Sequence, residues 1–487
     1  MLLEYIEKLS KKKLNSVAFL SEQKSITYSF FLYEVKRTIK FFKSCGLTSE
    51  TPLAIIIEKN ETIWSTIVAA SYLKIPVLLV DPNLKEAEMN QIMNLYQTCF
   101  ELRETKSSIC DKNNINKLNI FDNEYLLINS GILADCWNEY IYSDEDKQSY
   151  IVLLTSGSTK VPSAVVKTVS SIIGDGERIG RSLGITSSDR VLCVAPVYHA
   201  FGLICGCFAA FLTGATVSFI GSYVLPSTIE NRVRYLSCTI IMALPFHYKM
   251  MLNHVEKPFD QIRFALSSTS PISADIIESC KRKLNLSIVN IYGSSEAGGI
   301  SIQYNENFKG SCNSTGEIID EVLIKLDKTE SVQVDGIIVS ELLINSPSLA
   351  LGYLKIEGLE QKLYTLDEGW WRTGDLVYFD KQNQMNFAGR VNITINVNGK
   401  KVNPYEIEEV LSKHPAIEEV VVVGQSDDKR GEIPVAFVVL KEHVTQQEVL
   451  QFCYQRLSNY KIPKKIEFRD KLPKNSAGKI RRKELSN

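Results

Sequence analysis

The sequence predicts an α/β fold: a large N-terminal domain of parallel-type sheets with flanking helices plus a β-rich subdomain, and a small α+β C-terminal domain. The chain has 487 residues, more than one ordinary hydrophobic core contains. Short apolar runs alternate with helix-like stretches, which is the pattern of βαβ units in a parallel sheet. This pattern gives way to short β segments from about Glu317 and changes again near Gly389-Arg390. These breaks predict domains over residues 1–390 and 391–487.

The expected elements of the first part follow from its apolar periodicity. Gly46 ends the first long helix-like run, because glycine adopts the backbone conformation that closes a helix. Residues 101–150 are polar and irregular, so we expect them to be the least ordered or most peripheral part. The expected elements are a helix over 29–46, a strand over Leu53–Ile57, a helix over 60–75, and strands over 76–82 and Ile151–Leu154.

After residue 160 the alternation resumes, with helical stretches between strands. The last 97 or so residues read as a small α+β unit with two helices, each preceded by a capping signal. Asn403 is the expected cap of the first helix, with Pro404 at its first position and Glu406 as the reciprocal acid, and Thr445 with Glu448 forms the second capping box. Before this unit we expect strands at Val191–Val197, Thr216–Ile220, Thr239–Ala243, Phe264–Ser267 and Ile288–Tyr292.

The charge balance argues against several classes of partner. Lys and Arg total 55 and Asp and Glu total 56, so composition offers no case for nucleic acid or an anionic membrane surface. The run from Val191 to Ile229 has no charged side chain and is long enough to span a bilayer. Pro196, His199 and four glycines interrupt that run. We therefore expect strand, loop, buried helix and strand there, and no membrane span.

Cysteine usage predicts a reducing compartment. The eleven cysteines show neither CxxC pairing nor histidines at zinc spacing. Several, including Cys193, Cys205 and Cys207, lie inside apolar runs, which favours reduced core residues over a disulfide framework or a zinc site. The N-terminal sequence MLLEYIEKLSKKK has charges where a signal peptide needs an apolar stretch. We therefore expect a cytoplasmic protein that is not exported.

One segment has the chemistry of a phosphate-binding loop. The apolar strand Ile151–Leu154 is followed by five small or hydroxylated residues, Thr155 to Thr159, and then by Lys160. A tight loop with exposed backbone N–H groups and hydroxyl donors is suited to hold phosphate oxygens. The Walker A pattern is absent, and clusters of Ser, Thr and Gly after strands are often plain loops. The loop alone therefore leaves both interpretations open.

Eight segments in a fixed order resolve this ambiguity, because together they resemble the adenylate-forming (ANL) superfamily. That superfamily comprises AMP-binding acyl-CoA synthetases, stand-alone adenylation enzymes and luciferase-like proteins. The resemblance runs from about residue 150 to the C-terminus. The segments are LLTSGSTKVPSAV, YHAFG, LSSTSPIS, NIYGSSEAGG, SELLINSPSLALGY, GWWRTGDL, GRVNITINVNGKKVNPYEIE and PKNSAGKIRRKEL.

The resemblance implies an ATP site. The loop that follows the strand Ile151–Leu154 would hold the β- and γ-phosphates of ATP. Two positions depart from the family pattern, because Lys160 stands where the family has Gly and Ser163 stands where it has its loop Lys. Lys160 could supply the missing cation, or the loop could be weakened. Glu296 would bind Mg²⁺, a hard cation that favours carboxylate and phosphate oxygens. The implied phosphate-loop residues are Thr155, Ser156, Gly157, Ser158, Thr159 and Lys160. The other implied nucleotide-binding residues of this region are Ser268, Thr269 and Ser270 against adenine, Tyr292 on the adenine ring, Ser295 at the α-phosphate, and Asn290 and Gly293 in the same segment.

Two further segments carry the residues that the resemblance assigns to the ribose and to catalysis. Asp375 would accept hydrogen bonds from both ribose hydroxyls, and Arg390 would reach the ribose or phosphate side. Lys479 would neutralise the charge that develops as a carboxylate displaces pyrophosphate. The resemblance implies a mobile C-terminal domain that rotates about a hinge between the two chemical steps. Asn392 stands at that hinge position, where the family commonly has Asp or Lys. Gly399 matches the glycine that lets a pantetheine arm pass close to the backbone.

The acid pocket is marked by His199, which matches the aromatic-or-His position at its mouth. Amino-acid-activating relatives have an Asp just beyond this position, whereas this chain has Ala200-Phe201-Gly202, which favours an acid without an α-amino group. Gly298 and Gly299 would leave space beside the pocket for a fatty chain or a flat aryl acid.

The expected catalytic set is therefore Lys479, Glu296, Thr155 and His199, acting with ATP and Mg²⁺ on a small-molecule carboxylic acid. Coenzyme A would accept the acyl group. Two alternatives stay open at this point: transfer to the phosphopantetheine of an acyl or aryl carrier protein, and a non-catalytic relative that binds nucleotide.

Overall fold

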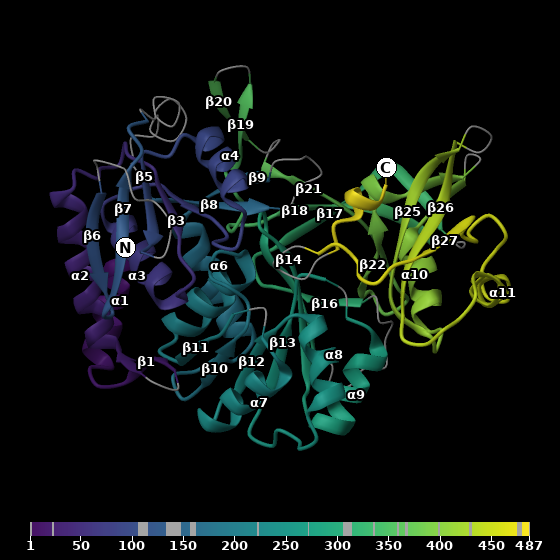
Figure 1. The fold of residues 1–487 in the computed structure, drawn as a ribbon, viewed down its shortest axis with the longest axis horizontal. Coiled ribbons are helices and arrows are strands. Elements are labelled where there is room, and N and C mark those ends of the chain that lie inside the picture. The colour runs from purple at the N-terminus through teal and green to yellow at the C-terminus, as the bar shows by residue number, and fades with distance from the viewer. Residues whose placement is uncertain are drawn as a thin grey trace. The chain divides into compact units, whose positions relative to one another are not determined.

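The computed structural model groups the chain into two compact units (Figure 1). The first unit contains Met1–Lys309, Ile318–Val322 and Asn345–Gly369, and the second contains Gly310–Glu317, Leu323–Ile344 and Trp370–Asn487. The boundary expected between residues 390 and 391 stays a prediction. The structure describes all residues except 1, 22–23, 106–114, 133–147, 156–161, 222–223, 271, 305–313, 335–336, 358–359, 366–368, 398–399, 428–430, 475–479 and 487.

One sheet of the first unit contains the hairpin that bears the phosphate-loop segment. Its strands, in spatial order, are β20 (Glu360–Thr365), β19 (Gly352–Glu357), β9 (Ser163–Thr168), β8 (Tyr150–Thr155), β4 (Val77–Leu79), β3 (Leu53–Ile56), β5 (Phe100–Glu104), β7 (Asn123–Asn129) and β6 (Ile115–Ile120). The central pairs β8–β4, β4–β3 and β3–β5 are parallel, and the outer pairs are antiparallel. The central strands are almost entirely buried, as a sheet covered on both faces requires.

The helices near this sheet agree with the expected pattern. Helix α2 begins after Thr27, whose hydroxyl accepts a hydrogen bond from the N–H of Phe30, and Gly46, with a φ of +79°, follows its end. The helices are α1 (Leu2–Lys12), α2 (Tyr28–Ser44), α3 (Asn60–Tyr72) and α4 (Glu86–Tyr96).

The second sheet is mostly parallel within this unit, and its β14–β15 pair is an antiparallel hairpin. Its strands are β2 (Ser25–Thr27), β1 (Val17–Leu20), β11 (Thr216–Phe219), β10 (Arg190–Cys193), β12 (Ile240–Ala243), β13 (Phe264–Ser267), β14 (Ile288–Ser294) and β15 (Gly298–Tyr304), in that spatial order. All pairs from β1 to β14 are parallel, and β1–β2 and β14–β15 are antiparallel. The five strands expected between residues 191 and 292 are confirmed, with small differences at their ends.

The helices between these strands cover the sheet. They are α6 (Val169–Ser182), η1 (Gly202–Phe211), α7 (Pro226–Tyr235), α8 (Pro245–His254) and α9 (Ala274–Leu284). The expected buried helix after His199 is present, but η1 is a π-helix with all ten residues buried. Among the described helices, none combines the length and apolar character that crossing a bilayer requires.

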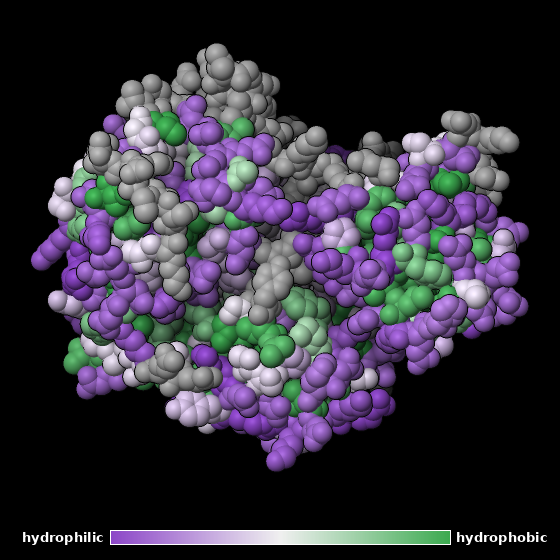
Figure 2. Space-filling view, in the orientation of Figure 1, coloured by the Kyte–Doolittle hydropathy of each residue, from purple (hydrophilic) through white to green (hydrophobic). Residues whose placement is uncertain are grey.

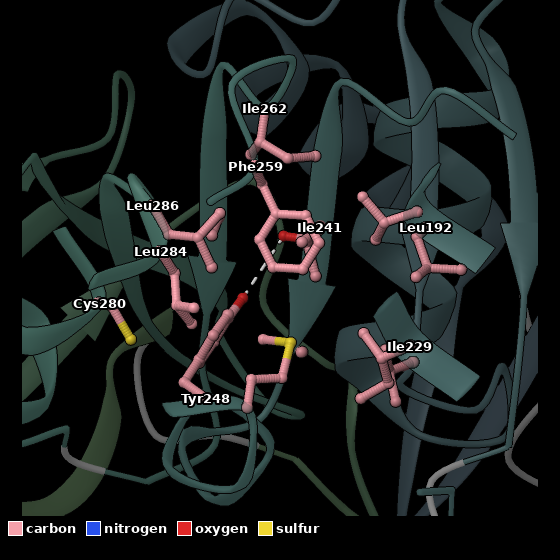
Figure 3. Close-up of a cluster of buried hydrophobic side chains, with 14 of the residues drawn as sticks. Leu192, Ile229, Ile241, Tyr248, Phe259, Ile262, Cys280, Leu284 and Leu286 are labelled. Atoms are coloured by element: carbon pink, nitrogen blue, oxygen red, sulfur yellow. Dashed lines mark hydrogen bonds between the residues drawn. The ribbon is translucent and has the colours of Figure 1, made fainter. Parts of the chain in front are cut away.

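A hydrophobic core lies between this sheet and helices α7, α8 and α9 (Figure 3). Tyr248 of α8 is fully buried there, and its hydroxyl donates to the backbone carbonyl of Leu266 at 2.6 Å. Phe259 and Ile241 lie beside it. This core packs against β10, β12, β13 and β14, and because these strands are parallel their carboxyl ends lie at one edge of the sheet.

The second unit contains a β-rich part and a small α+β part. The β-rich strands, in order, are β17 (Leu323–Val334), β18 (Ile337–Asn345), β21 (Trp371–Phe379), β22 (Met385–Arg390) and β16 (Ser314–Ile318). The other sheet has the order β24 (Lys400–Val402), β23 (Ile395–Val397), β26 (Gly431–Leu440), β25 (Ile417–Asp427), with β27 (Lys465–Phe468) pairing with β26. Its helices and short turns are η4 (Val391–Ile393), α10 (Pro404–Ser412), α11 (Gln446–Tyr454) and η5 (Arg482–Leu485).

Two capping predictions have different outcomes. The box at Thr445 and Glu448 is confirmed, because each residue accepts from the other's backbone N–H. Asn403 caps α10 as expected, with its side-chain oxygen accepting from the N–H of Tyr405. The reciprocal role of Glu406 is wrong, since its carboxylate accepts from the buried ammonium of Lys461 at 2.7 Å.

The expectation that residues 101–150 are irregular was also wrong in part, although their strands do lie toward one edge of the sheet. β5, β6 and β7 form a regular antiparallel edge of the first sheet, with buried apolar residues on β7. The remaining residues of the segment, 106–114 and 133–147, lie outside the described residues.

On the face drawn in Figure 2, hydrophilic side chains predominate and hydrophobic ones form small groups. Among the described residues, buried hydrophobic side chains form clusters in both units.

Candidate functional site

Strand β14 and the turn that joins it to β15 carry five of the described candidate residues: Asn290, Tyr292 and Gly293 on the strand, and Ser295 and Glu296 in the turn. Tyr292, Ser295 and Glu296 are half-buried, and the turn closes where the N–H of Ala297 donates to the hydroxyl of Ser294. Gly293 is required here, because a Cβ at that position would lie 2.3 Å from the carbonyl oxygen of Gly298. Because β14 runs parallel to β13, this turn lies at the carboxyl end of a parallel strand, where α/β sheets bind ligands.

Glu296 is held at both its main chain and its side chain. Its carboxylate Oε1 accepts a hydrogen bond from the hydroxyl of Tyr353 at 2.8 Å. Its carbonyl oxygen accepts from the N–H of Ala350 at 2.7 Å and from the ammonium of Lys167 at 3.4 Å. These contacts fix the direction in which the carboxylate points.

Behind Glu296 lies a buried charged network that sequence reasoning missed. Lys167 is fully buried on β9, and its ammonium also donates to the carbonyl of Ser348. Burial lowers the pKa of Lys167 to about 8, although the nearby carboxylates of Asp175 and Glu296 oppose this shift. Burial likewise raises the pKa of Asp175, whose carboxylate accepts from the N–H of Gly299 at 3.1 Å. The available signal was a lysine inside the apolar strand AVVKT.

The network also explains why Gly298 and Gly299 carry no side chain. A Cβ on Gly298 would lie 2.1 Å from Oδ2 of Asp175, and one on Gly299 would lie 2.9 Å from Cδ1 of Ile179. Both glycines therefore allow close packing against α6. The expectation that they leave space beside an acid pocket is wrong, because Asp175 and Ile179 fill that space.

The base of the phosphate-loop hairpin is well defined. Thr155 and Ser163 are paired across β8 and β9, and the hydroxyl of Thr155 donates to the carbonyl of Ser163 at 3.3 Å. The hydroxyl of Tyr96 donates to the carbonyl of Pro162 at 2.6 Å. The other loop candidates, Ser156, Gly157, Ser158, Thr159 and Lys160, lie outside the described residues.

The second candidate segment follows β13. The hydroxyl of Ser268 donates to the carbonyl of Ile291 at 3.0 Å, which joins this segment to the strand of Tyr292. Thr269 has a φ of +77° and, like Ser270, is exposed. Within the described part of the chain, buried oxygens of Ser267 and Asn290, a pair in the β13–β14 register, have no hydrogen-bond partner. A ligand with donor groups could use them.

His199 follows β10 and is half-buried, with its ring centroid 4.8 Å from that of Tyr198. Burial lowers the pKa of His199, and the carboxylate of Asp81 opposes this effect. Sequence reasoning missed Asp81, although it follows the apolar strand VLLV at the edge where ligands bind. Its Oδ1 accepts from both nitrogens of Asn83, at 2.9 and 3.0 Å.

In the second unit, Asp375 and Arg390 are neighbours on β21 and β22. Nε of Arg390 donates to Oδ1 of Asp375 at 2.6 Å, and its Nη2 donates to the carbonyl of Thr373 at 3.1 Å. Asp375 is buried, and its own N–H donates to the hydroxyl of Thr373. The guanidinium therefore orients one edge of this carboxylate.

Lys479 and Gly399 lie outside the described residues, but the chain on either side of Lys479 is anchored in the second unit. Lys474 and Ile480 form an isolated antiparallel bridge. Arg482 makes a bidentate ion pair with Glu408, and its guanidinium carbon lies 4.6 Å from the ring centroid of Tyr405.

Two family models match the chain. The model described as AMP-binding enzyme matches residues 6–354, more than half of the chain. The model described as AMP-binding enzyme C-terminal domain matches residues 406–479.

Similar curated proteins are coenzyme A ligases. Oxalate–CoA ligase of Saccharomyces cerevisiae is 30% identical over 343 residues, which is 69% of this chain and 62% of the yeast protein. The chain thus spans less than two thirds of that relative's length. 2-succinylbenzoate–CoA ligase of Bacillus licheniformis is 27% identical over 474 residues, 96% of each chain.

Solved structures show the same fold. The o-succinylbenzoate CoA synthetase from Bacillus subtilis, in complex with its acyl-adenylate intermediate, has a TM-score of 0.82 at 23% identity. That alignment covers 99% of this chain and 98% of the other. The same synthetase in complex with ATP and magnesium ion also gives a TM-score of 0.82, at 22% identity.

These comparisons confirm the predicted fold class and the predicted resemblance. They do not favour the carrier-protein alternative, because the relatives named above are coenzyme A ligases. The chain belongs to the AMP-binding enzyme family of the adenylate-forming superfamily.

Proposed function

We propose that this chain is an acid–thiol ligase. It uses ATP to convert a carboxylic acid into an acyl-adenylate with release of pyrophosphate, and then transfers the acyl group to coenzyme A. The observation that carries the proposal is the turn after β14, where Tyr292, Ser295 and Glu296 lie together and Tyr353 links Glu296 to the sheet of the phosphate-loop hairpin. Relatives named as coenzyme A ligases support it.

The nucleotide has a chemically suitable site at this edge of the sheet. The ring of Tyr292 offers a flat apolar surface for adenine. The amide oxygen of Asn290 can accept from the amino group of adenine, and its buried position favours such a partner. Ser295 would donate to the α-phosphate, and Ser268, Thr269 and Ser270 would border the base. Asp375 would accept from the ribose hydroxyls, with Arg390 orienting its carboxylate.

Magnesium fits the residues present. In the described part of the chain no three acidic, His or Cys side chains form a metal cluster. Mg²⁺ is usually held by one or two carboxylates together with substrate phosphates, so a single half-buried carboxylate, Glu296, matches this mode. Tyr353 donates to Oε1 of that carboxylate, which leaves Oε2 available for the ion. When bound, the ion would neutralise phosphate charge.

The first chemical step joins a carboxylate oxygen to the α-phosphorus and breaks the bond to the bridging oxygen, so pyrophosphate leaves with that electron pair. The phosphate-loop residues from Thr155 to Lys160 would hold the departing phosphates. Lys479 would place an ammonium against the developing charge on the phosphate oxygens. No proton is needed at the carboxylate, which attacks as the anion.

The second step is attack of the coenzyme A thiolate on the acyl carbon, which releases AMP. Gly399 would let the pantetheine arm pass close to the backbone. Asn392 would serve as the hinge that moves Lys479 away, since Asn tolerates unusual backbone angles.

The acid substrate is proposed to lack an α-amino group. The residues after His199 carry no acid. Asp81 does supply a carboxylate near His199, but its Oδ1 is engaged by Asn83. The lowered pKa of His199 keeps its ring neutral at pH 7, so the ring can donate to a substrate oxygen without a charge. Oxalate and 2-succinylbenzoate, the acids named for the relatives, also lack an α-amino group.

The test is carboxylate-dependent exchange of labelled pyrophosphate into ATP. A panel of oxalate, 2-succinylbenzoate, benzoate, fatty acids and amino acids should include an acid that promotes exchange, followed by thioester formation with free coenzyme A. Thioester formation only with a holo carrier protein would identify the carrier as acceptor. ATP binding by calorimetry without exchange on any acid would support the non-catalytic alternative and contradict the proposal.

A cytoplasmic location is part of this proposal. Most of the described cysteines are buried thiols, and burial raises the pKa of Cys193 to about 12. Such thiols suit a reducing compartment, where ATP and coenzyme A are also available.

A further inference from the structure

The strand β19 connects the phosphate-loop hairpin to the turn that carries Glu296. β19 pairs with β9, so that Tyr353 lies opposite Val165 in the register. Just before β19, the N–H of Leu351 donates to the carbonyl of Val166, and the N–H of Ala350 donates to the carbonyl of Glu296. The segment from Ala350 to Tyr353 is thus bonded to both structures at once.

Two side chains on one face of this sheet reach Glu296. Directly paired residues in a sheet share a face, and residues two apart on one strand share it too. Tyr353, Val165 and Lys167 therefore lie on the same face. From that face the hydroxyl of Tyr353 donates to the carboxylate of Glu296, while the ammonium of Lys167 donates to its carbonyl oxygen.

We propose that Tyr353 is a positioning residue for the carboxylate of Glu296, and that Lys167 holds the main chain of the same residue. Strands β19 and β9 would thereby fix the position of the metal-binding carboxylate relative to the phosphate-loop hairpin. The inference rests on the proposed function, because it assumes that Glu296 binds Mg²⁺ with ATP. A carboxylate with one oxygen hydrogen-bonded presents its other oxygen in a fixed direction, which binding of an octahedral cation requires.

The test is the substitution Tyr353→Phe, which removes one hydroxyl and keeps the ring. We expect the wild-type protein to bind ATP more tightly with Mg²⁺ than without it, as measured by titration calorimetry. In Tyr353→Phe the affinity for ATP in the presence of Mg²⁺ should fall by about tenfold or more, while the affinity without Mg²⁺ stays unchanged. The Mg²⁺ concentration that half-saturates pyrophosphate exchange should rise by a similar factor.

The matched control is Tyr304→Phe. Tyr304 lies on β15, and its hydroxyl donates to the carbonyl of Ser182 instead of Glu296. This variant should bind ATP with Mg²⁺ as the wild type does. A thermal unfolding scan checks that Tyr353→Phe is folded.

The outcomes separate two kinds of failure. If the wild type shows no acid-dependent exchange and no Mg²⁺ effect on ATP binding, the proposed function fails. If the wild type shows both and Tyr353→Phe binds ATP with Mg²⁺ as tightly as the wild type or more tightly, only the positioning role of Tyr353 is overturned.

Discussion

The buried ammonium of Lys167 gives a quantitative prediction about stability. We consider Lys167→Met, which keeps an unbranched side chain of similar length but removes the charge. The variant loses hydrogen bonds to the carbonyls of Ser348 and Glu296 and leaves the buried carboxylate of Asp175 without this cation. Removing one partner of a buried charged pair costs about 3–5 kcal/mol. We expect about 3 kcal/mol at pH 7, because Gly299 still donates to Asp175 and Arg178 lies nearby.

The double variant Lys167→Met/Asp175→Asn distinguishes this cause from simple loss of packing. It removes both charges, and the asparagine can still accept from the N–H of Gly299. We expect it to regain most of the lost stability, because replacing a buried charged pair as a whole is often neutral. The assay is equilibrium urea unfolding of the wild type, both single variants and the double variant. A loss below about 1 kcal/mol in Lys167→Met, or no recovery in the double variant, would refute the reasoning.

Three further predictions use the same structure. The folded-state pKa of Lys167, about 8, lies below its ordinary value of 10.5, so the unfolded chain binds more protons between these values and stability should rise with pH there. From pH 7.5 to 9.5 the free energy of unfolding of the wild type, measured in urea, should rise by about 2 kcal/mol relative to that of Lys167→Met. The same change with pH in both proteins would contradict this. Gly298→Ala should cost about 3 kcal/mol, since its Cβ would lie 2.1 Å from Asp175 at a φ of +77°, and an unchanged urea midpoint would show that the helix can move aside. Lys479→Ala should slow pyrophosphate exchange at least about 100-fold while leaving ATP affinity nearly unchanged, and exchange at the wild-type rate would remove Lys479 from the mechanism.

Local pattern was enough to predict most of the fold. The apolar runs from residue 191 to 292 became the parallel strands of the second sheet, because a strand covered on both faces must be apolar throughout. The polar stretch after residue 100 was misread because β5 buries a charged pair, Glu101 with Arg103, and because β6, at the sheet edge, exposes several polar side chains. The π-helix after His199 was predicted only as a buried helix, and it packs closely against α6, where a Cβ on Gly176 would lie 2.5 Å from Cβ of Phe208.

The candidate site was predicted from motifs and completed by tertiary contacts. Glu296 and Tyr292 could be named from sequence because their segment has a recognisable order of residue types. Tyr353 could not, since its contact with Glu296 joins positions 57 residues apart. Glu406 was misassigned for the same reason, because a long-range partner, Lys461, displaced the expected local one.

The central claim is that a carboxylate oxygen attacks the α-phosphorus of ATP. The most direct measurement uses an acid that supports thioester formation, labelled with ¹⁸O in its carboxylate, followed by mass spectrometry of the products. The account predicts one ¹⁸O atom in AMP and none in pyrophosphate, because the bridging oxygen of the acyl-adenylate stays with AMP when the thiol attacks. Label in inorganic phosphate with formation of ADP, or AMP without label, would contradict it.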